Sequence, residues 1–294
     1  MSRKKTKVAI VALVLLAIVI GCVIGSSEAD TKGVSGTVNI AGSSALLPLA
    51  QNAAKTFMDK NPDSVINTNG GGSGQGLQQV SDGTIDIGGS DLLAEEKLDK
   101  KSASKLVDHQ VAITVIAPII NKDAGVKSLT TEQLIKVFTG KVTNWKQVGG
   151  NDCQIVLVSR PSSSGTRVTF EQYALKKHAS QSNQSLETDD SGTLIQMIQS
   201  VSGSIGYVAL SYLTGDPQVG IVSINGVKPS LKNVYNGKYT VWSYEHMYTK
   251  GQPKGAAKAF LQQMLSEEYG KKIEAMGYGI ASKLTAAAKA THTK

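Results

Sequence analysis

The chain has 294 residues and a formal net charge of +8, from 31 Lys and Arg against 23 Asp and Glu. Only 5 % of its residues are aromatic and its cations are spread along the chain, which argues against nucleic-acid binding, because that function usually shows a basic patch with interleaved aromatic side chains. Two cysteines and four scattered histidines are too few for a metal site of the Cys/His type.

The first 21 residues have the organisation of a signal peptide. A basic start, MSRKKTK, precedes an apolar run at 8–20 that is too short for a comfortable membrane span. The sequence VIGC at 19–22 resembles a lipobox, in which bacteria lipidate the cysteine and cleave the chain before it. The alternative is an uncleaved N-terminal anchor. Either arrangement predicts an extracytoplasmic protein tethered to the outer face of a membrane, and a lipidated Cys22 leaves Cys153 without a disulfide partner.

After a polar tether at 22–33, the chain begins to alternate strands and helices. GTVNIAG alternates like a strand, and residues 46–58 have the apolar spacing of a helix. VINTNGGG and TIDIGGSD are typical of a second and a third strand, with the short helix GQGLQQVSDG between them. This alternation predicts an α/β fold with parallel strand pairing.

The same alternation continues to the end of the chain. VAITVIAPIIN, at 111–121, is almost continuously apolar and β-branched, as in a strand buried on both faces. A capped helix is expected to follow Thr130 or Thr131 and to stop at Gly140. Further strands are expected at QIVLVSR, SIGYVAL and YTVWSYEHMYTK, and further helices at SSSGTRVTFEQYALKKH, SGTLIQMIQSV and GAAKAFLQQMLS. The last residues, ending in AAAKATHTK, are expected to form a frayed tail.

Three loops share one pattern: a strand, then glycine and serine, then the start of a helix. They are AGSSA at 41–45, GGGSG at 70–74 and SSSGT at 162–166. A helix N-terminus presents unpaired N–H groups and a partial positive charge, so it attracts anions. Glycine lets a ligand approach the backbone, and a hydroxyl donates one more hydrogen bond. Because such loops lie at the carboxyl ends of strands, they can converge on one anion.

Each residue of this pattern also has a purely structural alternative. Ser44, Ser73 and Ser164 are acceptable helix N-caps, although capping does not require a neighbouring glycine each time. Arg160 ends a strand four residues before Ser164, where it can fork onto an oxyanion or lie on the surface as a solvated cation. Asp91 ends the third strand and can bind at the site or cap the LLAEEKL segment.

Enzyme motifs are poorly represented. GGGSGQGLQQ lacks the Lys-Ser/Thr pair of a P-loop, and no serine lies in a GxSxG elbow. The histidines show no HxxxH spacing. A Ser-Lys hydrolase is not excluded by composition, but the SxxK match at 102–105 lies in a charged helix and outside the glycine-serine loops.

The ordered set of GSS at 42–44, GSG at 72–74, GSD at 89–91 and R160…SGT resembles the phosphate-binding lipoproteins of high-affinity phosphate ABC transporters. The resemblance covers about residues 34–285. It implies a two-lobed type II periplasmic-binding-protein fold that closes on one inorganic phosphate ion and delivers it to a membrane permease. It further implies a monomer that is not an enzyme and needs no metal or other cofactor.

The same resemblance implies which residues bind phosphate. Asp91 accepts the proton of the phosphate, and the other ligands are Ser44, Ala45, Ser73, Arg160, Ser164, Gly165 and Thr166. Two departures stand out. Ser44-Ala45 replaces a Thr-Phe pair of some members, which removes an aromatic wall, and Pro161-Ser162-Ser163 replaces a loop in which an acidic residue and glycine are frequent.

The lobes also follow from the resemblance. The first lobe holds 34–114 and 242–285, the second holds 115–241, and 286–294 form the tail. The alternative functions are a receptor for another tetrahedral oxyanion, such as sulfate or molybdate, and a secreted phosphate-ester hydrolase, for which metal ligands are lacking.

Lipidation at Cys22 is testable by mass spectrometry. We expect protein extracted from membranes to begin at a lipidated Cys22, because the apolar run and the VIGC sequence together direct cleavage before the cysteine. An intact terminus at Met1 or Ser2 would rule out this processing.

Overall fold

The computed structural model describes residues 33–180 and 185–292, and the chain from Val34 onward forms one compact unit. The predicted signal peptide, Cys22 and nearly all of the tether lie outside the described residues. Within these residues, no helix is both long enough and apolar enough to cross a membrane.

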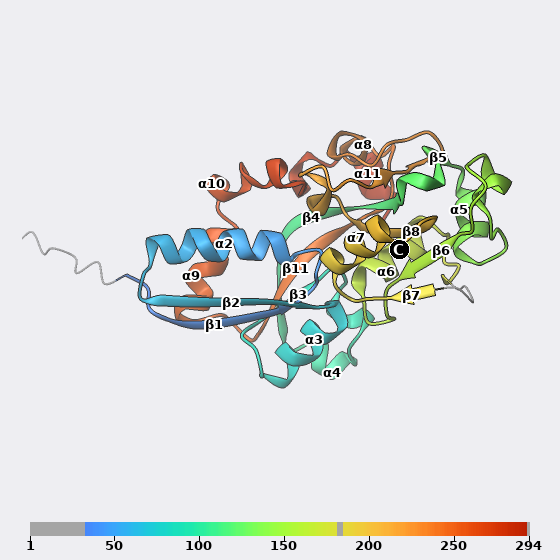
Figure 1. The fold of residues 1–294 in the computed structure, drawn as a ribbon. Coiled ribbons are helices and arrows are strands. Elements are labelled where there is room, and N and C mark those ends of the chain that lie inside the picture. The colour runs from blue at the N-terminus through green and yellow to red at the C-terminus, as the bar shows by residue number, and fades with distance from the viewer. Residues whose placement is uncertain (1–32, 181–184, 293–294) are drawn as a thin grey trace, which may run out of the picture. The chain divides into compact units, whose positions relative to one another are not determined.

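The first half of the main sheet is built around β1. Its strands are β1 (Gly36–Gly42), β2 (Ser64–Gly71), β3 (Ile87–Ser90) and β11 (Trp242–Lys250). β1 pairs in parallel with β2 and with β3, as the alternation of strands and helices predicts. The helices of this half are α2 (Leu47–Lys60), α3 (Ser73–Asp82), α4 (Lys100–Ala103), α9 (Gly255–Met264) and α10 (Glu267–Gly270). Since α2 and α3 directly follow β1 and β2, both helices begin at the same edge of the sheet (Figure 1).

Two long strands connect this half to the second. β4 (Leu106–Ile120) pairs with β11 along 106–115 and with β8 along 116–120, so one strand belongs to both halves (Figure 1). These pairings are antiparallel, as is that of β11 with β3. The expected parallel pairing therefore does not extend to the connecting strands. The reason is the topology of the chain: β4 runs out of the first half and β11 runs back into it, so the two strands have opposite directions.

The second half repeats the parallel arrangement. Its main strands are β6 (Val156–Ser159), β7 (Ser185–Glu187) and β8 (Ser204–Ala209), and β6 lies between the other two and parallel to both. The short β9 (Gly220–Ile221) pairs with β4, while β5 (Ser128–Leu129) and β10 (Ser223–Ile224) form a small separate sheet. The helices are α5 (Thr131–Phe138), α6 (Gly165–Tyr173), α7 (Ser191–Ser200) and α8 (Leu231–Tyr235). Thr130 caps α5, which confirms one of the two predicted capping residues.

Aromatic packing fills the core of the second half. The ring of Phe170 on α6 stacks on Tyr207 of β8 at 4.2 Å between centroids, and Phe138 of α5 packs 5.0 Å from Phe170. Trp145 is entirely buried, and its indole N–H donates to the carbonyl of Gly203 at 2.7 Å. The aromatic contacts pack α5 and α6 against β8, which pairs with β6, the strand that ends next to Arg160.

The C-terminal segment is not a frayed tail within the described residues. It contains α11 (Ala286–Ala290), which Thr285 caps and in which Ala288 is fully buried. The ring of His292 lies between Tyr173 at 3.8 Å and Trp242 at 3.7 Å, and its Nε2 lies 2.8 Å from the carbonyl oxygen of Trp242. Burial lowers the pKa of His292 to about 4, so the ring is neutral at physiological pH and stacks without a charge to solvate.

Helix α3 lies so close to the sheet that only glycine fits at Gly76. A Cβ there would lie 2.6 Å from Cα of Gly42, 2.7 Å from the carbonyl oxygen of Ala41 and 2.8 Å from that of Gly89. All three are backbone atoms of β1 and β3, which cannot move independently of the sheet.

We therefore expect Gly76→Ala to lower the free energy of unfolding by about 1–3 kcal/mol, as overpacking usually does. Gly270→Ala is the matched control, because Gly270 is also helical but has no atom within 4 Å of the added Cβ. The control should be neutral or slightly stabilising. Denaturant unfolding of both variants tests this, and equal midpoints would contradict the close approach.

Candidate functional site

Polar loops from both halves of the sheet meet at the carboxyl ends of the parallel strands. The loops follow β1, β2, β3, β6 and β7, and four of them lead into helices. The helices α3, α6 and α7 begin at Ser73, Gly165 and Ser191, which are all buried. Their unpaired N–H groups give this region the electrostatic character of an anion site.

The loop after β1 carries two buried serines with different contacts. The backbone N–H of Ser43 donates to the carbonyl of Gly89 at 2.9 Å, and its hydroxyl donates to Asp91. The hydroxyl of Ser44 lies 3.0 Å from that of Ser191 and accepts from Arg160 at 2.6 Å. Ser44 does not cap α2, whose N-cap is Leu46 without a side-chain bond. Ser44 therefore faces the second half of the sheet.

Asp91 connects the two halves through its carboxylate. Its Oδ1 accepts from Ser43, its Oδ2 accepts from Thr166 on α6 at 2.8 Å, and its backbone N–H donates to Ser73 at 3.0 Å. The side chain is 3 % exposed. The capping alternative is wrong for Asp91, because the short helix that follows has Leu93 at its N-cap position.

Arg160 is entirely buried at the end of β6, so it is not a surface cation. Its guanidinium donates to Ser44 at 2.6 Å, to the carbonyl of Asp189 at 2.5 Å and to Ser191 at 3.2 Å. The carboxylate of Asp189 lies 3.8 Å from it. Burial raises the pKa of Asp189, while the charge of Arg160 acts in the opposite direction. Within the described part of the chain, Nε of Arg160 has no hydrogen-bond partner.

The remaining predicted ligands surround this cluster. Ser164 does cap α6, since its hydroxyl accepts from the N–H of Arg167 at 3.4 Å, so the capping alternative is correct for this serine. Gly165 lies against Ser73, and a side chain there would collide with that hydroxyl. Ala45 is fully buried, and its carbonyl accepts from Tyr278 at 2.5 Å. All eight predicted residues thus lie in one region of the structure.

Sequence reasoning missed four polar residues of this region: Ser43, Asp189, Ser191 and Tyr212. The phenol of Tyr212 donates to the carbonyl of Ser44 at 2.8 Å. The sequence did contain a signal for Ser191, because SGT at 191–193 repeats SGT at 164–166 at the start of a helix. The SGT at 191–193 follows two acids, however, and only the fold shows that Arg160 faces Asp189.

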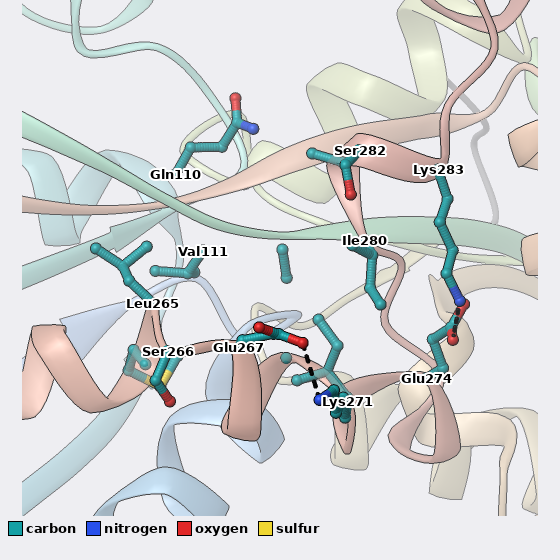
Figure 2. Close-up of a pocket in the computed structure, with 15 residues that line it drawn as sticks. Gln110, Val111, Leu265, Ser266, Glu267, Lys271, Glu274, Ile280, Ser282 and Lys283 are labelled. Atoms are coloured by element: carbon teal, nitrogen blue, oxygen red, sulfur yellow. Dashed lines mark hydrogen bonds and ion pairs between the residues drawn. The ribbon is translucent and has the colours of Figure 1, made fainter.

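The largest of the described pockets contains none of the predicted ligands. Figure 2 shows a pocket of about 500 Å³ between the start of β4 and the C-terminal helices, where Glu267 pairs with Lys271 and Glu274 with Lys283. A cavity of about 280 Å³ does reach Asp91 and is also lined by Ser243 and Tyr173. No group of three or more metal-ligating side chains occurs in the part of the chain that the structure describes.

Comparison with known proteins places the chain in a family. A family model described as a PBP superfamily domain matches residues 27–268. The chain is 49 % identical to the phosphate-binding protein PstS of Bacillus subtilis over 84 % of its own length and 81 % of that protein. It is 33 % identical, with a TM-score of 0.74, to a substrate-binding protein assigned to a phosphate ABC transporter and solved with bound phosphate, from Clostridium perfringens, covering 83 % and 98 % of the two chains. A phosphate transport receptor from Vibrio cholerae, 24 % identical over 83 % of this chain and 100 % of that one, shares the fold with a TM-score of 0.64.

Two neighbouring arginines allow a direct test of the geometry. Arg167 donates to the carbonyl of Arg160 at 2.6 Å and pairs with Glu171 at 2.8 Å, so it supports the backbone without reaching the serine cluster. We expect Arg160→Ala to weaken the binding of inorganic phosphate at least about tenfold, because hydrogen bonds to charged groups are worth roughly 1.5–3 kcal/mol each.

Arg167→Ala is the control and should mainly lower the melting temperature. Calorimetric titration and thermal unfolding of both variants separate the two effects. Small and equal losses of affinity would show that Arg160 does not face the anion.

Proposed function

The chain belongs to the PBP superfamily and to its phosphate-binding PstS proteins, and on that premise we propose that it is an extracytoplasmic receptor that binds inorganic phosphate and delivers it to an ABC permease. The observation that carries the proposal is the position of Asp91. This carboxylate lies among hydroxyls, helix N-termini and a buried arginine, and it joins the two halves of the sheet. A site of this kind attracts an oxyanion and still offers an acceptor for its proton.

The proposed phosphate ligands come from both halves. Ser44, Ala45, Ser73 and Asp91 follow strands of the first half, and Arg160, Ser164, Gly165 and Thr166 follow β6 in the second. Arg160 supplies the positive charge, and the hydroxyls and helix N-termini supply hydrogen bonds. Supporting this, direct hydrogen bonds already connect Ser44 with Arg160 and Asp91 with Thr166. Closure of the two lobes thus assembles one site from two incomplete ones.

We propose lobe boundaries near 114/115 and 241/242. The first lobe then holds 34–114 and 242–285, and the second holds 115–241. The register of the sheet supports this division, because β4 changes partner from β11 to β8 between Val115 and Ile116. β11 begins at Trp242.

Asp91 is the proposed specificity residue. Helix N-termini, hydroxyls and Arg160 attract any oxyanion, so they do not distinguish phosphate from sulfate. At neutral pH phosphate still carries a proton to donate, whereas sulfate carries none. With sulfate bound, Asp91 would face an oxygen lone pair, and two negative charges would be desolvated together.

We propose further that the protein is not an enzyme, that it acts as a monomer, and that a lipid at Cys22 anchors it to the outer face of the membrane. Its relatives are phosphate-binding receptors. The site hydroxyls also support the first point, since their described hydrogen-bond partners are Arg160, Asp91, one another and backbone groups, and none is a histidine.

Calorimetric titration with phosphate, sulfate and molybdate tests this function. We expect the wild type to prefer phosphate over sulfate by about 10⁴-fold or more, as sites built around one hydrogen bond do. Asp91→Asn can donate an N–H instead, so it should keep much of the phosphate affinity and gain affinity for sulfate. Asp59→Asn, an exposed carboxylate on α2, is the control and should leave both affinities unchanged.

Two results would contradict the proposal. One is a wild-type protein that binds sulfate or molybdate as tightly as phosphate. The other is an Asp91→Asn variant with an unchanged preference, which would reduce Asp91 to a structural residue.

A further inference from the structure

A second carboxyl group, that of Glu245, lies close enough to Asp91 to interact with it. Glu245 is on β11, where the next residue, His246, pairs with Ser90 of the antiparallel β3. The ladder ends at this pair, and Glu245 and Asp91, which interact electrostatically, are the next residues along the two chains. Because side chains alternate along a strand, these two carboxyl groups lie on the same face of the sheet, as neighbours across the two chains.

The carboxyl of Glu245 is fully buried and poorly paired. Its residue is 0 % exposed, and neither carboxyl oxygen makes a hydrogen bond of normal geometry to the described residues. The hydroxyls of Thr114 and Ser243, on the strands around it, are also buried without such a bond. An ionised carboxylate in this position would lose its hydration with no cation in return, which is very costly.

The groups that interact electrostatically with Glu245 come from four elements, and none of those in the described part of the chain is a cation. Asp91 lies at the end of β3, Thr114 on β4, Tyr212 on the short helix after β8, and Tyr278 near the C-terminus. Burial above all, and then the charge of Asp91, raises the pKa of Glu245 well above its usual range. Burial also raises the pKa of both tyrosines, so neither contributes a charge.

We propose that Glu245 is a positioning residue of the anion site: it remains a neutral carboxylic acid behind Asp91 and directs its proton to the Asp91 carboxylate, which keeps Asp91 ionised and oriented toward the ligand. This inference rests on the proposed function, in which Asp91 accepts the proton of phosphate. It adds a residue, Glu245, that does not contact the ligand but controls the charge of Asp91, which does.

The capacity of Asp91 as an acceptor allows this arrangement. A carboxylate has about four lone-pair positions. Ser43 and Thr166 use one on each oxygen, which leaves one for Glu245 and one for the ligand. Thr114 faces Glu245 and can donate to its carbonyl oxygen. If Glu245 lost its proton, two carboxylates and a phosphate anion would lie together in a buried region, and phosphate affinity would fall.

The protonation state of Glu245 can be read directly by NMR. In protein labelled with ¹³C at the glutamate carboxyl carbon, we expect one resonance that stays in the protonated position through neutral pH and disappears in Glu245→Gln. Glu132→Gln, a change at an exposed glutamate on α5, should remove a resonance that titrates at acidic pH, since the hydrogen bond with Lys136 lowers the pKa of Glu132. A Glu245 resonance that titrates with the exposed glutamates would overturn the proposal.

Calorimetry then tests the positioning role. Glu245→Gln keeps a neutral donor, so its phosphate affinity at pH 7 should stay close to that of the wild type. Glu245→Met keeps the length but has no donor, and we expect a loss of about tenfold or more, which corresponds to one hydrogen bond to a charged group. As the pH is raised, affinity should fall in the wild type relative to Glu245→Gln, because only the wild type acquires the second charge.

The outcomes separate this inference from the proposed function. A wild type without phosphate affinity would refute the function itself. Phosphate binding by the wild type, with the same affinity and pH dependence in folded Glu245→Met and Glu245→Gln, would refute only the role of Glu245. If Glu245→Met does not fold, the NMR titration and the pH profile of Glu245→Gln still test the proposed role of Glu245.

Discussion

The buried charge of Arg160 is the constraint on which the site depends. A guanidinium that is fully removed from water is stable only where its N–H groups find acceptors and its charge finds a counterion. In this protein the acceptors come from Ser44, Asp189 and Ser191, and the nearest carboxylate is that of Asp189. Ser44 follows β1 and the other two follow β7. The charge at the end of β6 therefore holds together loops that are far apart in the sequence.

The same interaction explains how the loop after β6 dispenses with an acidic residue of its own. Asp189 supplies the carboxylate near Arg160 from the loop before α7. The loop at 161–163 is then free to make backbone contacts with the first half: the carbonyl of Ser163 accepts from Gly74 at 3.0 Å, and that of Ser162 accepts from Lys97 at 2.9 Å. Charge neutralisation and contact between the halves are thus divided between two loops.

The features that can be predicted from the sequence are those that depend on residues close together in the chain. Features that depend on residues far apart in the chain cannot be predicted in this way. The strands and helices around the glycine-serine loops are local patterns, and the strand-then-helix rule places those loops at one edge, so the eight predicted ligands lie together. The role of Asp189 depends on a neighbour 29 residues away. The burial of Glu245 depends on its place in the sheet, and the stacking of His292 depends on contacts with Tyr173 and Trp242. Periodicity contains no information about such long-range contacts.

The shared strand β4 also limits how the protein can move. Its backbone hydrogen bonds continue from β11 to β8 without a loop between them, and β11 runs beside it as the second connection. Sliding of one half past the other would break both ladders at once, whereas a small change of twist near Val115 and Ile116 breaks neither. We therefore expect the two halves to move by hinge rotation and not by shear. Segments far from this axis travel furthest, so modest changes in a few backbone dihedral angles can admit and release an ion.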